Sequence, residues 1–125
     1  MTGLIFFAAC KKNHDKSTAD MVSGKWKVSS LQETHTSTAD TVSYPYTGQS
    51  GDYMDFRSDG KMYSFYDNYA DTTDYKVLSD KYLLLGGDSM QIKTLSDASL
   101  TLYLKYTDAY YSPVRTVEVT YNLAK

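Results

Sequence analysis

Residues 53–66 read YMDFRSDGKMYSFY, and this stretch decides the fold class. Apolar and polar side chains alternate on both sides of Asp59-Gly60, as they do in strands with one buried face. An Asp-Gly pair between two such runs is a strong hairpin signal, because glycine adopts a positive φ without steric cost. The stretch therefore predicts two antiparallel strands, at residues 53–57 and 61–66, joined by a tight turn at Gly60.

Similar short segments recur on both sides of this hairpin, roughly every eight to twelve residues, with turn residues between them. They cover residues 25–31, 42–46, 74–78, 82–85, 90–95, 100–106 and 114–123. The segment at 42–46 is the weakest, and Pro45 within it favours an edge or a bend. Closure into a barrel removes the unpaired edges that sequential hairpins would leave. We therefore expect an all-β fold, a small antiparallel eight-stranded up-and-down barrel.

The alternation also predicts which side chains fill the interior of this barrel. In the first segment it places Trp26, Val28 and Ser30 on one face. The bulky residues expected to point inward are Trp26, Met54, Phe56, Leu102, Leu104, Val117, Val119 and Tyr121. A barrel of about eight strands has room for side chains or one small ligand, so we expect a small or nearly filled cavity. The one helical signal is a single turn at residues 17–22.

The chain begins with a short apolar run, GLIFFAA at residues 3–9, followed by Cys10. The run is too short to span a membrane, which takes about 20 residues, and is typical of a signal peptide. Phe7-Ala8-Ala9-Cys10 resembles a lipobox, which implies lipidation and cleavage at Cys10. The alternative is a buried core thiol at Cys10. Since residues 1–3 carry no lysine or arginine, we expect the signal peptide to be truncated.

The domain organisation follows from the abrupt change in composition after Cys10. We expect a signal peptide at residues 1–9, a lipidated cysteine and polar tether at 10–20, and one β-barrel domain at 21–125. Lys11, directly after the cysteine, resembles the pattern of lipoproteins delivered to the outer membrane. The expected location is therefore the cell envelope, with a lipid anchor in the outer membrane. The domain would face either the periplasm or the cell surface.

Composition narrows the classes of partner. The net charge is −2 and lysines are scattered apart from Lys11-Lys12, so a nucleic-acid partner is not expected. One cysteine cannot form an internal disulfide. Tyrosine is unusually frequent, with 13 copies, and this residue suits pleated surfaces that are half buried.

Gly24-Lys25-Trp26 at the start of the first segment matches the G-x-W motif of lipocalins. Together with the 53–63 hairpin and the later Leu95…Leu100-x-Leu102 pattern, it makes residues 20–125 resemble the lipocalin-like domains of Gram-negative lipoproteins. The resemblance implies a structural role for Gly24, Trp26 and Arg115, with the arginine stacked on the tryptophan. The chain is shorter than a typical lipocalin and lacks a C-terminal helix pattern, so we expect a shallow barrel.

Catalytic and metal signals are weak. His14 falls in the tether and His35 in or near the first connection, so a nucleophile–histidine–acid set is not expected. The carboxylates Asp52 and Asp55 are expected to be exposed strand and turn residues. Acidic residues at 67–74 form an expected loop that lacks the glycine and closing glutamate of an EF-hand. We expect no enzyme activity, no cofactor and no metal.

Tyrosines in predicted loops are the candidate contact residues. They are Tyr44, Tyr46, Tyr66, Tyr69, Tyr110 and Tyr111, and the alternative is that they cap the barrel ends. The leading functional hypothesis is a membrane-anchored, non-catalytic module that binds a small apolar or amphipathic ligand. The second hypothesis is a filled-core envelope protein that binds another protein or a glycan through these loops.

Overall fold

A computed structural model of the chain describes residues 16–125. The predicted all-β fold class is confirmed, because strands make up most of this part and the described helix has only five residues. The elements are α2 (Thr18–Val22), β1 (Gly24–Thr36), β2 (Thr41–Thr47), β3 (Tyr53–Phe56), β4 (Lys61–Tyr66), β5 (Tyr69–Val77), β6 (Tyr82–Leu85), β7 (Asp88–Leu95), β8 (Ser99–Asp108) and β9 (Arg115–Ala124).

The strands form one antiparallel sheet that closes on itself. From β3 to β9 each strand pairs with the next one in sequence, and β1 pairs with both β3 and β9. Eight strands therefore make a closed barrel, and β2 is an additional strand on the outer edge of β1. The predicted eight-stranded barrel is confirmed. Pro45 lies in β2, which is an edge strand, as the proline predicted.

One edge of β1 is shared by two partners. Residues 24–27 pair with β3, and residues 30–36 pair with β2. The loop at 48–52 between these partners is fastened to β1, since the Gly48 N–H donates to the Ser29 carbonyl at 2.9 Å. A Cβ at Gly48 would overlap the carbonyl oxygen of Val28, so this close approach requires glycine.

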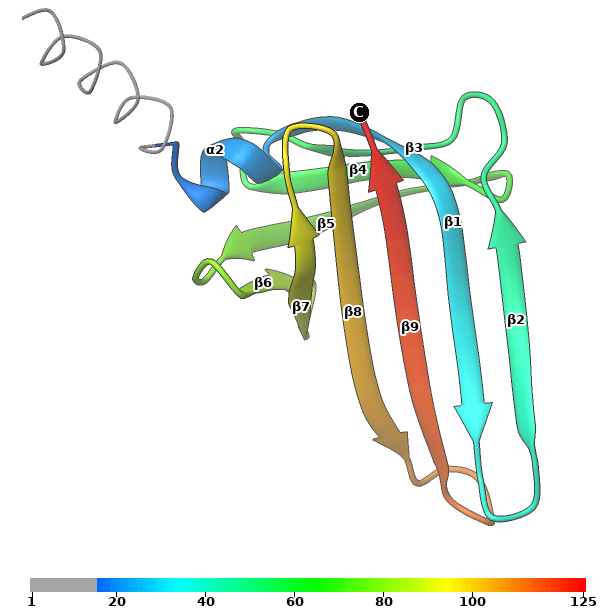
Figure 1. The fold of residues 1–125 in the computed structure, drawn as a ribbon. Helices are drawn as coiled ribbons and strands as arrows, with labels where there is room; N and C mark the ends of the chain where they lie inside the picture. Colours follow the sequence, from blue (N-terminus) through cyan, green and yellow to red (C-terminus); the bar gives the residue numbers. More distant parts are fainter. Residues whose placement is uncertain (1–15) are drawn as a thin grey trace, which may run out of the picture.

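Four strands extend beyond the rest of the barrel. In Figure 1, β8, β9, β1 and β2 continue side by side past the ends of the shorter strands β3 to β7. β7 pairs with β8 only as far as Tyr103, so the remainder of β8 has no partner on that side within the described chain. We call this extension the projecting sheet: residues 31–36, 41–47, 104–108 and 115–119.

The strand registers show which side chains share the inner face of these four strands. Cross-strand neighbours point to the same face of a sheet. Three rows result: Tyr46–Leu31–Tyr121–Leu102, Tyr44–Glu33–Val119–Leu104 and Val42–His35–Val117–Tyr106. The first row borders the barrel core and the third lies farthest from it. These three rows are therefore largely apolar and aromatic, with Glu33 as their acidic and His35 as their basic side chain.

The core fills the opposite end of the barrel. Trp26, Phe56, Met54, Leu100 and Leu102 are almost fully buried there. Most residues predicted to point inward are buried, and the remaining two, Leu104 and Tyr121, are partly buried and pack against this core. Ser30 is an exception, because a β-bulge between Val28 and Ser30 turns Leu31 inward in its place.

The helix α2 covers this filled end and confirms the helical turn predicted at 17–22. Ser17 caps it by accepting a hydrogen bond from the Asp20 N–H, and Val22 is completely buried. The indole N–H of Trp26 donates to the Val22 carbonyl at 2.8 Å, which ties the helix to β1. The helix begins at Thr18, so the last residues of the segment expected to be a tether belong to it.

Candidate functional site

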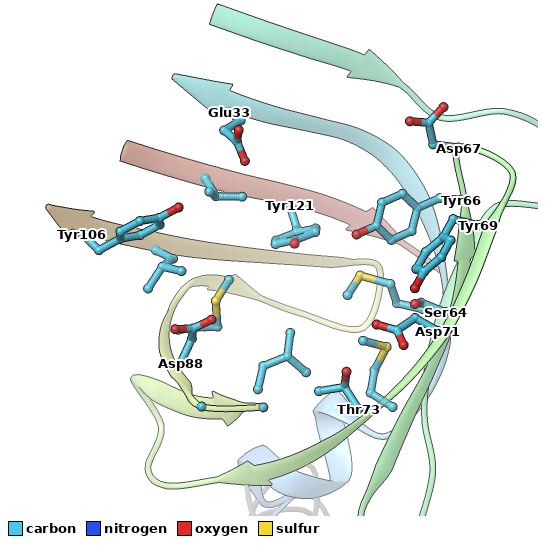
Figure 2. Close-up of a pocket in the computed structure, with 18 residues that line it drawn as sticks. Glu33, Ser64, Tyr66, Asp67, Tyr69, Asp71, Thr73, Asp88, Tyr106 and Tyr121 are labelled. Atoms are coloured by element: carbon cyan, nitrogen blue, oxygen red, sulfur yellow. The ribbon is translucent and has the colours of Figure 1, made fainter. Parts of the chain in front are cut away.

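The open end of the barrel contains a cavity of about 730 Å³. Its lining comes from both walls of the molecule: β1, β8 and β9 on one side, and β4, β5 and the β6–β7 hairpin on the other (Figure 2). It is open to solvent because the second wall ends before the projecting sheet does (Figure 1). The barrel is therefore filled by the core at one end and hollow at the other.

The floor of the cavity is apolar and rich in methionine. Met54, Met62 and Met90 are each no more than 5% exposed, yet all three line the cavity. Leu85, Leu104 and Val119 complete the apolar surface. Methionine side chains are unbranched and flexible, so they adapt to ligands of different shape. The floor is therefore suited to a hydrocarbon body without a fixed outline.

Tyrosines form the walls above this floor. Tyr66 and Tyr121 meet edge to face with ring centroids 6.5 Å apart, and Tyr69 and Tyr106 stand closer to solvent. Burial raises the pKa of Tyr121 above its usual range, as expected for a phenol held away from water. These rings present apolar faces to the cavity while their hydroxyls can bind polar groups.

Carboxylates surround the mouth. Glu33 comes from β1, Asp67 from the β4–β5 turn, Asp71 from β5 and Asp88 from the start of β7 (Figure 2). Glu33 is 2.8 Å from the Nε2 atom of His35, and no lysine or arginine is among the lining residues of the described chain. The mouth therefore carries an uncompensated negative charge whenever these acids are ionised.

Ser64 is a buried polar residue within this otherwise apolar floor. It is 6% exposed, points into the cavity from β4, and lies opposite Asp71 in the β4–β5 register. Its side chain therefore adds a polar group to the surface of the cavity.

The candidate tyrosines separate into four groups. Tyr66 and Tyr69 line the cavity. Tyr46 is structural, because its hydroxyl donates to Asp52 and accepts the Asp67 N–H at 3.0 Å. Tyr44 lies on the projecting sheet beside His35. Tyr110 and Tyr111 are exposed in the β8–β9 connection, away from the cavity.

Several lining residues were missed as contact residues by the sequence reasoning. Tyr106, Tyr121 and Leu104 had the correct inward alternation, but that signal indicates burial and does not distinguish a core from a cavity wall. Residues 69–77 form a strand, so the loop expected at 67–74 is wrong beyond the Asp67-Asn68 turn. Tyr69, Asp71 and Thr73 share its inward face.

The G-x-W motif lies at the opposite, filled end, but its predicted partner is wrong. The amino group of Lys125, at the end of β9, lies 4.4 Å from the Trp26 ring centroid. Arg115 begins β9 at the far end of the barrel and stacks on Tyr111 at 4.7 Å. The correction follows from register, because Trp26 faces Met54 while Arg115 faces Asp108, at opposite ends of the strands.

A second, basic depression of about 630 Å³ lies at the filled end of the barrel. Lys25, Lys27 and Lys125 line it together with the 48–52 loop. Lys25 lies over the Tyr53 ring at 4.3 Å, and Lys125 also donates to the Ser23 carbonyl at 3.3 Å. This depression thus has three lysines and one aspartate, Asp52, in its lining, whereas the cavity lining has four carboxylates and no lysine or arginine.

The acidic pairs considered from sequence do not converge on a reactive centre. Asp52 is buried against Tyr46, which corrects its expected exposure, whereas Asp55 pairs with Arg57. Asp74 pairs with Lys61, and Asp71 points into the cavity. Within residues 16–125, no three His, Cys, Asp or Glu side chains are grouped as metal ligands would be. Cys10 and His14 lie outside the described residues.

No protein-family model, no curated protein and no solved structure matches the chain significantly. Across residues 16–125, no helix has the length and apolar character needed to cross a membrane.

Proposed function

We propose that the domain is a non-catalytic binding module that holds a small apolar or amphipathic molecule in the open end of its barrel. One observation carries the proposal: a cavity of about 730 Å³ with an apolar, methionine-rich floor and access from solvent. Its volume lies within the range of about 300–1,000 Å³ that small-molecule sites occupy. Apolar floors with a few polar groups are typical of such sites.

We further propose that the module is a lipoprotein of the outer membrane, attached through lipid on Cys10. The lipobox-like residues 7–10 and the polar segment after them support this attachment. Two or more acyl chains hold a protein stably on a membrane, whereas one chain binds reversibly. Labelling of growing cells with an alkyne fatty acid should mark the wild-type chain and leave Cys10→Ser unmarked. Equal labelling of both chains would contradict lipidation at this residue.

Ligand uptake is testable with diphenylhexatriene, a neutral probe whose emission rises in apolar surroundings. The full chain carrying Cys10→Ser should bind it saturably. Leu104→Trp, which fills the cavity from β8, should weaken binding by about tenfold or more. Lys105→Trp is the matched control, because the next residue points to the outer face and is exposed. No saturable binding of this probe or its charged derivatives would contradict the proposal, as would equal binding by both tryptophan variants.

The exposed tyrosines of the β8–β9 connection favour a second candidate function, recognition of an envelope protein or a glycan. Tyr110 is 95% exposed and contacts Tyr111 edge to face with ring centroids 6.3 Å apart. Exposed aromatic pairs bury area with little loss of side-chain entropy when they bind. Crosslinking in intact envelopes should yield a partner that is lost in Tyr110→Ser/Tyr111→Ser. An unchanged crosslink pattern would contradict this candidate.

A further inference from the structure

We propose that the cavity selects amphipathic cations, molecules with an apolar body and a positively charged head group. This inference rests on the proposed binding function and adds the charge class of the ligand. It follows from the separation of surface types within one cavity: hydrocarbon and sulfur at the floor, aromatic rings above them and carboxylates at the mouth.

The four mouth carboxylates come from separate elements and are spread around one cavity, so each contributes negative potential to the same space. Glu33 faces the cavity from the projecting sheet, and Asp88, Asp71 and Asp67 face it from the opposite wall (Figure 2). Asp67, Asp71 and Asp88 have no ion-pair partner within residues 16–125. Clefts lined by charge of one sign concentrate ligands of the opposite sign and repel ligands of the same sign.

The raised pKa of Tyr106 agrees with a negative potential produced by these carboxylates. Its pKa is raised, first by burial and then by the nearby charges of Glu33, Asp108 and Asp88. Both effects disfavour a further negative charge at this site. The carboxylate of a fatty acid would meet the same opposition.

The tyrosine walls can contribute attraction of a second kind. Cations bind over the faces of aromatic rings, and clusters of rings form the common sites for organic ammonium groups. Tyr66, Tyr69, Tyr106 and Tyr121 stand between the apolar floor and the acidic mouth. A cationic head group placed between the floor and the mouth would lie near both the tyrosine rings and the mouth carboxylates.

Ser64 adds a polar group at the same level of the cavity. Its side chain points into the cavity from β4, and Asp71 lies directly opposite it on β5. A cationic head group near this pair would be attracted by the carboxylate of Asp71.

Three probes of one shape test the inference: diphenylhexatriene, its trimethylammonium derivative and its propionic acid derivative. We expect the full chain carrying Cys10→Ser to bind the cationic probe about tenfold or more tightly than the neutral probe, and the anionic probe least tightly. Glu33→Gln/Asp88→Asn should remove most of the cationic advantage, measured as the ratio of cationic to neutral affinity. Asp80→Asn/Asp97→Asn is the control, because it removes the same charge from exposed turns outside the cavity lining.

The outcomes separate the inference from the function on which it rests. Equal affinity for the three probes, or preference for the anion, would overturn the cation selectivity and leave the binding function intact. Loss of the cationic advantage in the control variant as well would also overturn it, since the effect would then be one of net charge. Binding of none of the probes would overturn both proposals.

Discussion

Tyr46 shows how one side chain connects loops that are distant in sequence. Its hydroxyl donates to the buried carboxylate of Asp52, at the end of the loop after β2, and accepts the Asp67 N–H of the β4–β5 turn. The bond to Asp52 raises the pKa of Tyr46, because the carboxylate favours the protonated phenol. These bonds connect β2, whose outer edge has no strand partner in the described chain, to the β4–β5 turn.

We predict that Tyr46→Phe lowers the free energy of unfolding by about 1–3 kcal/mol, because the buried Asp52 carboxylate then keeps only the Gln49 N–H and the Asp67 N–H loses its acceptor. Tyr44→Phe is the control, since Tyr44 lies two residues away on the same face and is 53% exposed. Urea denaturation would measure both. If Tyr44→Phe lowered the free energy of unfolding as much as Tyr46→Phe does, the role assigned to the Tyr46 hydroxyl would be contradicted.

At the residue scale, local turn chemistry could be predicted from the sequence and long-range pairing could not. Gly60 has φ of 81° in the β3–β4 turn, as the Asp-Gly signal required. The prediction that Arg115 stacks on Trp26 was wrong, because it depended on which end of β9 lies next to the tryptophan. That depends on the register between strands far apart in sequence.

The element most dependent on a single contact is α2. A helix of five residues is too short to be stable alone, so its order comes from docking on the barrel. Val22 supplies the buried contact and its carbonyl accepts the Trp26 indole N–H. The tryptophan therefore fixes the helix over the filled end of the barrel.

We predict that Trp26→Phe lowers the free energy of unfolding by about 1–3 kcal/mol and increases amide exchange in residues 18–22. Binding of diphenylhexatriene should be unchanged, because Trp26 is not among the cavity-lining residues. Hydrogen exchange and probe titration on the same variant would test both statements. An unchanged melting temperature of Trp26→Phe, or loss of its diphenylhexatriene binding, would contradict a purely structural role for Trp26.

Strand positions were more predictable than strand lengths. The hairpin at 53–66 and the edge character of Pro45 followed from local chemistry. By contrast, β5 begins at Tyr69 although residues 70–74 read ADTTD and resemble a loop. Pairing with β4 overrides the weak local preference of these residues, because strand propensity depends strongly on context.

Titration of tyrosines with raised pKa values should make the whole molecule less stable at alkaline pH. The pKa values of Tyr46, Tyr63, Tyr75, Tyr103, Tyr106 and Tyr121 are all raised, by hydrogen bonds to carboxylates or by burial. A group with a folded pKa above its unfolded value stabilises the fold below the unfolded pKa. That contribution is lost as the pH rises through the folded pKa.

We therefore predict that the free energy of unfolding falls steadily once the pH exceeds 10, the ordinary pKa of tyrosine. Tyr121→Phe should reduce this dependence, because burial gives Tyr121 the largest shift. Tyr110→Phe is the control, as Tyr110 is almost fully exposed. Urea denaturation across this pH range would measure the slope. An equal slope in wild type and Tyr121→Phe would contradict the assignment.

The cavity itself is a property of the whole molecule, which explains why local patterns did not reveal it. It exists because β1 pairs with three strands and four strands extend past the others. The inward residues were predicted, but an inward position belongs to a filled core at one end and to a cavity wall at the other. Only the relative lengths of the strands distinguish the two ends.

Native mass spectrometry tests the central claim, a ligand in the open end of the barrel, most directly. The full chain carrying Cys10→Ser would be purified from the envelope of its own host without detergent, and gentle and denaturing spectra would be compared. The account predicts a discrete additional mass that is lost on denaturation, absent from Leu104→Trp and retained by Lys105→Trp. A bare wild-type chain under gentle conditions, or an additional mass retained equally by Leu104→Trp, would contradict it.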